Sequence, residues 1–204
     1  MDIWPVVHAE RKALVTDLSG LDANQWSTTS LATEWTVRDV LAHMTATAKI
    51  TPGGFFPHLA SSGFSFSKMQ AKDIATEAGS STADTLANFE AIASSTKRPP
   101  GPPATMLGET IVHSQDIRGP LGIQHDYPMA ALVQVADFYK GSNLLIGTKK
   151  RIAGLTLKAT DTEWSHGSGP EVTGPMLPLL MAMTGRKVTD QLTGDGVETL
   201  RSRP

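Results

Sequence analysis

The chain has 204 residues, a formal net charge of -2 and a hydrophobic content of 40%, enough apolar material to fill the core of a medium-sized domain. The near-neutral charge and the lack of an extended basic cluster argue against nucleic acid as a partner. With no cysteine, disulfides, thiolate metal ligands and a cysteine nucleophile are excluded. Any thiol chemistry therefore needs a thiol supplied from outside.

The distribution of apolar residues bears on the compartment. No apolar run approaches the length needed to span a bilayer. The first residues, MDIWP, lack the basic region and hydrophobic stretch of a signal peptide. We therefore expect a cytoplasmic protein with no membrane partner.

Two helices are predicted in the first part of the chain. Apolar residues recur at helical spacing from about residue 4 to residue 20 and predict the first helix. Glu10 falls on the same stripe, where we interpret it as a rim residue or half of a surface ion pair, with an approach to a functional site as the alternative. Thr36 followed by Asp39 is a variant of the capping box and predicts a second helix from Val37.

The middle of the chain predicts two more helices. The sequence PGG at 52–54 breaks the helical pattern, and the phenylalanine-rich run after it is a lid, a pocket wall or ordinary core, with the pocket wall favoured. Capping residues at 80–84 begin a third helix that ends near 97–98. The sequence PPGPP at 99–103 predicts an extended connection, and a fourth helix runs from about 104 to 118.

The pattern changes toward the C-terminus. A fifth helix is predicted from Pro128 to about Ile146. Beyond it we expect short strands at 155–160 and 170–173, a helix at 176–184 closed by Gly185, and further short strands at 188–192 and 197–200. The predicted fold class is mainly α: an up-down four-helix bundle at 1–150, followed by a small α/β domain at 151–204.

One group of residues has the spacing of a metal site. Glu109 and His113 stand four residues apart in the fourth predicted helix, so both side chains project from one face. His43, in the second predicted helix, is the best candidate for a third ligand. Two nitrogens, one carboxylate and an open position are typical of a catalytic site for zinc or a similar divalent ion, because structural sites usually have a fourth protein ligand.

Each of these residues also has a simpler interpretation. Glu109 and His113 together are also a surface pair that stabilises a helix modestly, although His113 lies on the apolar side of that helix. A lone His43 is more often a hydrogen-bonded core residue than a ligand. Asp116, one turn beyond His113, is a candidate acceptor for the second imidazole N–H, with a fourth metal ligand and a helix-end acid as alternatives.

Two segments carry a resemblance to a known family. Residues 34–43, EWTVRDVLAH, and 108–117, GETIVHSQDI, resemble the mycothiol-dependent maleylpyruvate isomerase family, within the broader group of DinB-like metal-binding bundles. The segments LTLKATD at 155–161, GSGPEVTGP at 167–175 and TGR at 184–186 resemble the small second domain of that family. The resemblance implies a DinB-like four-helix bundle in which His43, Glu109 and His113 bind zinc or another divalent ion, with mycothiol as cosubstrate.

Together with these residues, the resemblance implies a mycothiol-dependent transferase or cis-trans isomerase that acts on a small electrophilic metabolite through a metal-bound thiolate. The alternatives are a metal-dependent hydrolase that uses metal-bound water, or a non-catalytic small-ligand binding protein of the same fold. Arg186, after the Gly185 turn, is a candidate contact for a substrate or thiol carboxylate, with a surface arginine as the alternative. The expected oligomeric state is a monomer or homodimer.

Overall fold

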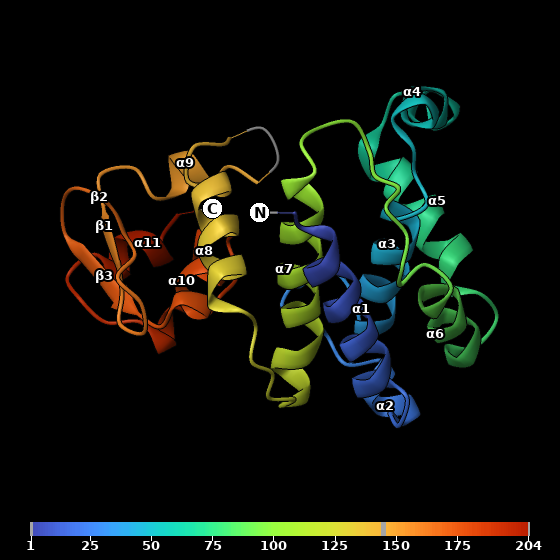
Figure 1. The fold of residues 1–204 in the computed structure, drawn as a ribbon, viewed down its shortest axis with the longest axis horizontal. Coiled ribbons are helices and arrows are strands. Elements are labelled where there is room, and N and C mark those ends of the chain that lie inside the picture. The colour runs from blue at the N-terminus through green and yellow to red at the C-terminus, as the bar shows by residue number, and fades with distance from the viewer. Residues whose placement is uncertain (1, 144–145, 204) are drawn as a thin grey trace. The chain divides into compact units, whose positions relative to one another are not determined.

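The computed structural model describes residues 2–143 and 146–203. The chain divides into two compact units, Met1–Asp126 and Tyr127–Pro204. The first unit is helical, with α1 at Trp4–Leu18, α2 at Ala23–Trp26, α3 at Val37–Thr47, α4 at Pro52–Ser61, α5 at Phe66–Ala78, α6 at Thr82–Glu90 and α7 at Ala104–Leu121 (Figure 1).

Four helices of the first unit form its core. Helices α1, α3, α6 and α7 contact one another as a bundle, while α5 packs on α3 and α4 packs on α5. The bundle core contains buried apolar side chains from all four helices, among them Leu14, Leu41, Phe89 and Ile117. Burial of such side chains is the main favourable contribution to the stability of this unit.

Helix α3 begins at the residue that the sequence predicts. Thr36 and Asp39 form a reciprocal capping box, in which the Thr36 backbone N–H donates to Asp39 Oδ2 (3.0 Å) and the Asp39 N–H donates to Thr36 Oγ1 (3.2 Å). Two of the otherwise unpaired N–H groups of the helix start are thus satisfied. The cap fixes where α3 begins and therefore which side chains face the bundle core.

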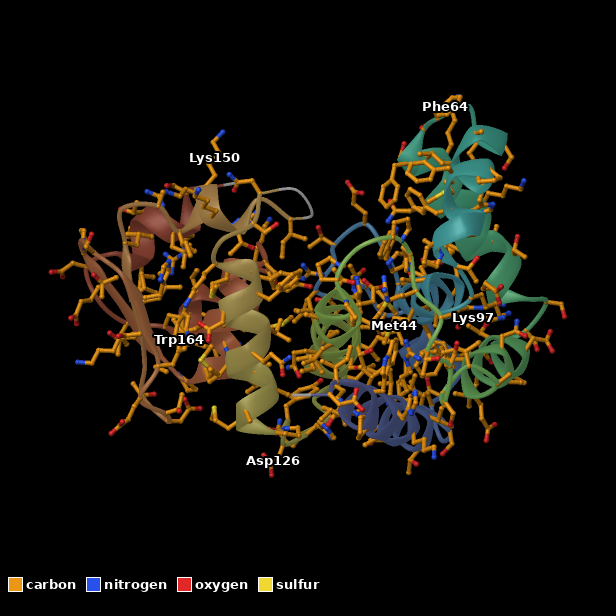
Figure 2. All side chains as sticks on the ribbon, turned by 45° about the horizontal axis from the view of Figure 1, so that its top comes forward. Met44, Phe64, Lys97, Asp126, Lys150 and Trp164 are labelled. Atoms are coloured by element: carbon orange, nitrogen blue, oxygen red, sulfur yellow. The ribbon has the colours of Figure 1, made fainter. Side chains whose placement is uncertain are left out.

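Helices α4 and α5 were not predicted from the sequence. The PGG segment that we interpreted as a break begins α4 instead, because Pro52 occupies the first turn, where a missing N–H costs nothing, and the Thr51 side chain accepts from the Gly54 N–H. Phe56, Phe64 and Phe66 are all more than half exposed, so they are not ordinary core. Figure 2 shows Phe64 at the tip of the α4–α5 hairpin.

The second unit is a small α/β arrangement. Its elements are α8 at Met129–Tyr139, α9 at Thr148–Arg151, β1 at Thr156–Ala159, β2 at Ser165–Gly167, β3 at Glu171–Gly174, α10 at Met176–Met183, a 3-10 turn at Thr189–Gln191 and α11 at Val197–Arg201. The three strands form one sheet in the order β2-β1-β3, antiparallel between β1 and β2 and parallel between β1 and β3. The predicted fold class, mainly α with a small C-terminal α/β part, is confirmed.

Several details of this unit differ from the sequence prediction. The segments predicted as strands at 188–192 and 197–200 contain the 3-10 turn and α11, so that prediction is wrong. The helix predicted to reach about residue 146 ends at Tyr139, and residues 144 and 145 lie outside the described residues. The units divide after Asp126, whereas the predicted boundary follows residue 150, because α8 packs against α10.

None of the helices in the described part of the chain combines the length and the apolar composition needed to cross a bilayer.

Candidate metal centre

Helices α3 and α7 lie side by side in the first unit and carry the three candidate ligands (Figure 1). His43 projects from the middle of α3, next to Met44, which is 2% exposed in the bundle core (Figure 2). Glu109 and His113 lie one turn apart on α7. The packing of these two helices thus brings His43 together with two residues that lie 66 and 70 positions later in the chain.

The donor atoms of the three side chains converge. His43 Nε2 lies 3.0 Å from Glu109 Oε1, and His113 Nε2 lies 3.6 Å from Glu109 Oε2. One ligand atom from each residue lies within 4.8 Å of the other two. The three side chains are between 11% and 20% exposed, so this cluster is largely buried but keeps some contact with solvent.

The cluster fits a divalent metal in two respects. Ligands that surround zinc tetrahedrally at bonds of about 2.0–2.1 Å lie roughly 3.3 Å apart, close to the 3.0 Å and 3.6 Å separations measured from Glu109. In addition, Glu109 Oε1 is a buried oxygen with no aligned hydrogen-bond donor in the described structure. A buried carboxylate oxygen without a donor is costly, and a cation is a partner that would satisfy it.

Asp116 lies directly behind His113. Its Oδ2 is 2.9 Å from His113 Nδ1, and its side chain is completely buried. A carboxylate at Nδ1 favours the tautomer that carries its proton there, which leaves the Nε2 lone pair directed toward Glu109. Of the three interpretations of Asp116, the structure therefore favours the acceptor for the second imidazole N–H.

The two imidazoles favour the charged form of Glu109. Burial alone would raise the pKa of Glu109, but the positive charges that His113 and His43 can carry lower this pKa to about 2.

Two residues near the cluster were missed by the sequence analysis. The first is Arg11, which is 1% exposed and adds positive charge near Glu109. Burial lowers the pKa of Arg11 to about 10, with the charge of Glu109 opposing that shift. Arg11 lies on the apolar stripe of α1, and nothing in that pattern indicated that its charge would lie near Glu109.

Trp35 is the second missed residue. Its ring centroid lies 4.7 Å from that of His43 and 6.1 Å from that of His113, and the two imidazoles are 5.1 Å apart in an edge-on arrangement. The indole thus packs on both candidate ligands and restricts the ring orientations open to them. A tryptophan immediately before a helix cap has no sequence signature that would have indicated this contact.

Two further candidates were named from the sequence, Glu10 and Arg186. Glu10 is buried, not at a rim, and pairs with His125 at 2.7 Å and with Arg118 at 3.7 Å. Arg186 belongs to the second unit, where its Nη1 donates to the Thr184 carbonyl at 3.0 Å. Its proposed role as a carboxylate contact stays a prediction.

Comparisons with known proteins point to one family. Residues 7–100 match the family model described as the mycothiol maleylpyruvate isomerase N-terminal domain. Comparison with curated protein sequences gives no significant match.

Two crystal structures share the fold of the whole chain. One is described as the mycothiol-dependent maleylpyruvate isomerase, with a TM-score of 0.67, 17% sequence identity and coverage of 94% of this chain and 91% of that chain. The other is a histidine-to-alanine mutant of the mycothiol-dependent maleylpyruvate isomerase, with a TM-score of 0.66, 16% identity and the same coverage. The resemblance noted from the sequence is confirmed: residues 7–100 match the mycothiol maleylpyruvate isomerase N-terminal domain, and the chain has the fold of the mycothiol-dependent enzyme.

Proposed function

We propose that this protein is a metal-dependent enzyme that uses a low-molecular-weight thiol, mycothiol, to act on a small electrophilic metabolite as a cis-trans isomerase or S-transferase. The single observation that carries the proposal is the convergence of His43, Glu109 and His113 donor atoms within 4.8 Å. Its occurrence in a chain with the fold of a mycothiol-dependent isomerase supports the choice of a thiol over water as the nucleophile.

Residues of α3 and α7 would supply the metal ligands, and their neighbours would orient these ligands. His43 and His113 would each offer a nitrogen and Glu109 a carboxylate oxygen, a ligand set typical of zinc with room for a further ligand. Asp116 Oδ2, 2.9 Å from His113 Nδ1, would hold the imidazole proton at that nitrogen, and Trp35 packs against both imidazoles. A divalent cation in this site would lower the pKa of a thiol bound to it, so that the thiolate forms near neutral pH.

The proposed chemistry follows from a nucleophilic sulfur. Addition of the thiolate to an electrophilic carbon of a double bond conjugated to a carbonyl forms a C–S bond and moves the π electron pair onto the carbonyl oxygen as an enolate, so the former double bond can rotate. Return of that electron pair expels the same thiolate and restores the double bond with the opposite geometry, whereas protonation of the enolate carbon retains the adduct and gives S-transfer. In either case the thiol must be held so that its sulfur reaches the cluster on α3 and α7.

Arg186 is proposed as a contact for a carboxylate of the substrate or thiol, because a guanidinium can bind a carboxylate with two parallel hydrogen bonds. Replacement of Arg186 by alanine should lower turnover while the metal content stays unchanged. Unchanged turnover in this variant would remove Arg186 from the site.

The test of the reaction class is thiol dependence. The metal-loaded protein is incubated with maleylpyruvate and with a panel of other small electrophiles, with and without mycothiol, and the products are analysed by mass spectrometry. We expect isomerised products or thiol adducts above the uncatalysed rate only when mycothiol is present. Addition of water to a substrate without mycothiol would contradict the proposal and identify a hydrolase.

A further inference from the structure

A cavity of about 490 Å³ opens in the first unit, at the C-terminal end of α3. It is lined by residues at and just after the end of α3, by two residues of α4 and by one face of α5, and we call it the α3–α5 pocket. Figure 1 shows these three helices together in the first unit. A cavity of this size is within the usual range for small-molecule sites.

The pocket and the metal centre share the last turns of α3. Ala46 lines the pocket and follows His43 by three residues, so both side chains lie on one face of the helix, about 4.5 Å apart along its axis. The next residue, Thr47, lies close enough to Glu109 to contribute to the lowering of its pKa. A molecule seated in the pocket therefore has one end within about one helical turn of the candidate ligands.

Most of the pocket surface is apolar, but its lining also holds ionisable side chains whose charges nearly balance. Lys49 Nζ lies 2.6 Å from Glu77 Oε2, and His58 Nε2 lies 2.7 Å from Asp73 Oδ1. Lys72 adds a second ammonium group. The lining thus contains two ammonium groups, two carboxylates and one imidazole, in pairs that offer hydrogen-bond donors and acceptors side by side.

This arrangement selects between the two molecules that the reaction needs. A dianionic electrophile gains no net attraction from this lining, because the ammonium groups that attract it stand beside the Asp73 and Glu77 carboxylates that repel it. An uncharged hydroxyl-rich group needs no net charge, because each hydroxyl can donate to a carboxylate and accept from an ammonium group. The lining therefore fits a polyhydroxylated group better than it fits a carboxylate-rich one.

We propose that the α3–α5 pocket binds the uncharged, hydroxyl-rich body of the thiol cosubstrate, with the sulfur directed along α3 toward His43, Glu109 and His113. This inference rests on the proposed function, since it assigns a seat to the thiol that the function requires. The electrophile then approaches the sulfur from outside the pocket.

The test uses two threonines in matching environments. Thr76 on α5 lines the pocket, and Thr16 on α1 does not. Both are exposed helical residues whose hydroxyl donates to the carbonyl four residues earlier, at 2.9 Å for Thr76 and 3.2 Å for Thr16. Thr76→Phe fills the pocket, while Thr16→Phe places the same ring on a similar helix surface elsewhere.

The probe is S-methyl mycothiol, which keeps the body of the thiol but has no sulfur proton to lose. Its dissociation constant is measured by calorimetry with wild type and with both variants. We expect at least tenfold weaker binding to Thr76→Phe, unchanged binding to Thr16→Phe and equal metal content in all three proteins. Equal affinity for wild type and Thr76→Phe would overturn the assignment of the pocket.

A second pair of variants tests the polar lining without adding bulk. Glu77→Gln removes a carboxylate from the pocket, and Glu90→Gln makes the same change on the exposed end of α6. Binding of S-methyl mycothiol should weaken severalfold only in Glu77→Gln, and equal affinity for these two variants would contradict the role of the lining.

The remaining outcomes separate this inference from the proposed function. A higher half-saturating concentration of maleylpyruvate in Thr76→Phe, with that of mycothiol unchanged, would assign the pocket to the electrophile and overturn the inference alone. Failure of wild type to bind mycothiol or S-methyl mycothiol would overturn both the inference and the proposed function.

Discussion

Nδ1 of His113 lies 2.9 Å from Oδ2 of Asp116, and the Asp116 side chain is completely buried. The two residues stand three positions apart on α7, so one turn of one helix supplies both a candidate ligand and the acceptor that orients it. A carboxylate behind a ligating imidazole fixes its tautomer and raises its basicity.

Replacement of Asp116 by asparagine should therefore weaken metal binding while leaving the three donors in place. The neutral amide is a weaker acceptor for the imidazole N–H, so we expect metal affinity to fall by about 10- to 100-fold. Competition with a chromophoric chelator measures this affinity. Asp126→Asn, an exposed position in the same unit (Figure 2), is the control, and equal affinities for both variants would rule out the orienting role of Asp116.

The contact between Trp35 and the two imidazoles predicts an optical signal. The Trp35 ring centroid is 4.7 Å from that of His43, so metal binding, which fixes and polarises the imidazoles, should change the fluorescence of this indole. The chain has four tryptophans, and replacement of Trp35 by phenylalanine should abolish the metal-dependent change. A change of the same size in Trp35→Phe would place the metal beside another tryptophan.

Much of the fold was predictable where local signals and burial agree. The capping box at Thr36 fixes the start of α3, and the apolar run of α10 ends at Gly185, whose φ of +88° favours glycine. Helices α4 and α5 were missed because they bury little: α4 has no buried residue and α5 buries only Met69. In addition, α4 starts with Pro52, Gly53 and Gly54 and contains Pro57, residues that are typical of turns and loops.

The candidate site was predictable to a similar extent. His43, Glu109 and His113 were proposed from residue type and helical spacing, and the structure brings them together. Arg11 and Trp35 were not proposed, because a buried cation and an aromatic contact depend on the packing of α1, α3 and α7 and leave no spacing in the sequence. The charges of the α3–α5 pocket were missed because α4 and α5 were not recognised as helices.

A buried ion-pair cluster between α1 and the end of α7 makes a separate prediction about stability. Arg118 has a fully buried side chain, its Nε donates to Asp17 Oδ2 at 2.7 Å, and its Nη1 lies 3.7 Å from Glu10 Oε2. Arg118→Ala would leave the buried Glu10 carboxylate without this cation. We expect the free energy of unfolding to fall by about 3–5 kcal/mol, measured by chemical denaturation.

The matched control is an exposed ion pair. Arg201 pairs with Glu198 at the surface, with side chains 51% and 77% exposed, so Arg201→Ala should change the free energy of unfolding by less than about 1 kcal/mol. If Arg118→Ala and Arg201→Ala lowered the free energy of unfolding by similar amounts, the buried ion pairs of Arg118 would not stabilise the protein more than an exposed pair does.

The proposed function depends most directly on metal binding by His43, Glu109 and His113. Purified wild type and the variants His43→Ala, Glu109→Ala and His113→Ala are loaded with zinc, dialysed and measured by elemental analysis, with folding checked by circular dichroism. We expect close to one metal ion per chain in wild type and marked loss in each folded variant, because each change removes one of three ligands. Metal retained at the wild-type level by all three variants would contradict the assignment of His43, Glu109 and His113 as the metal centre.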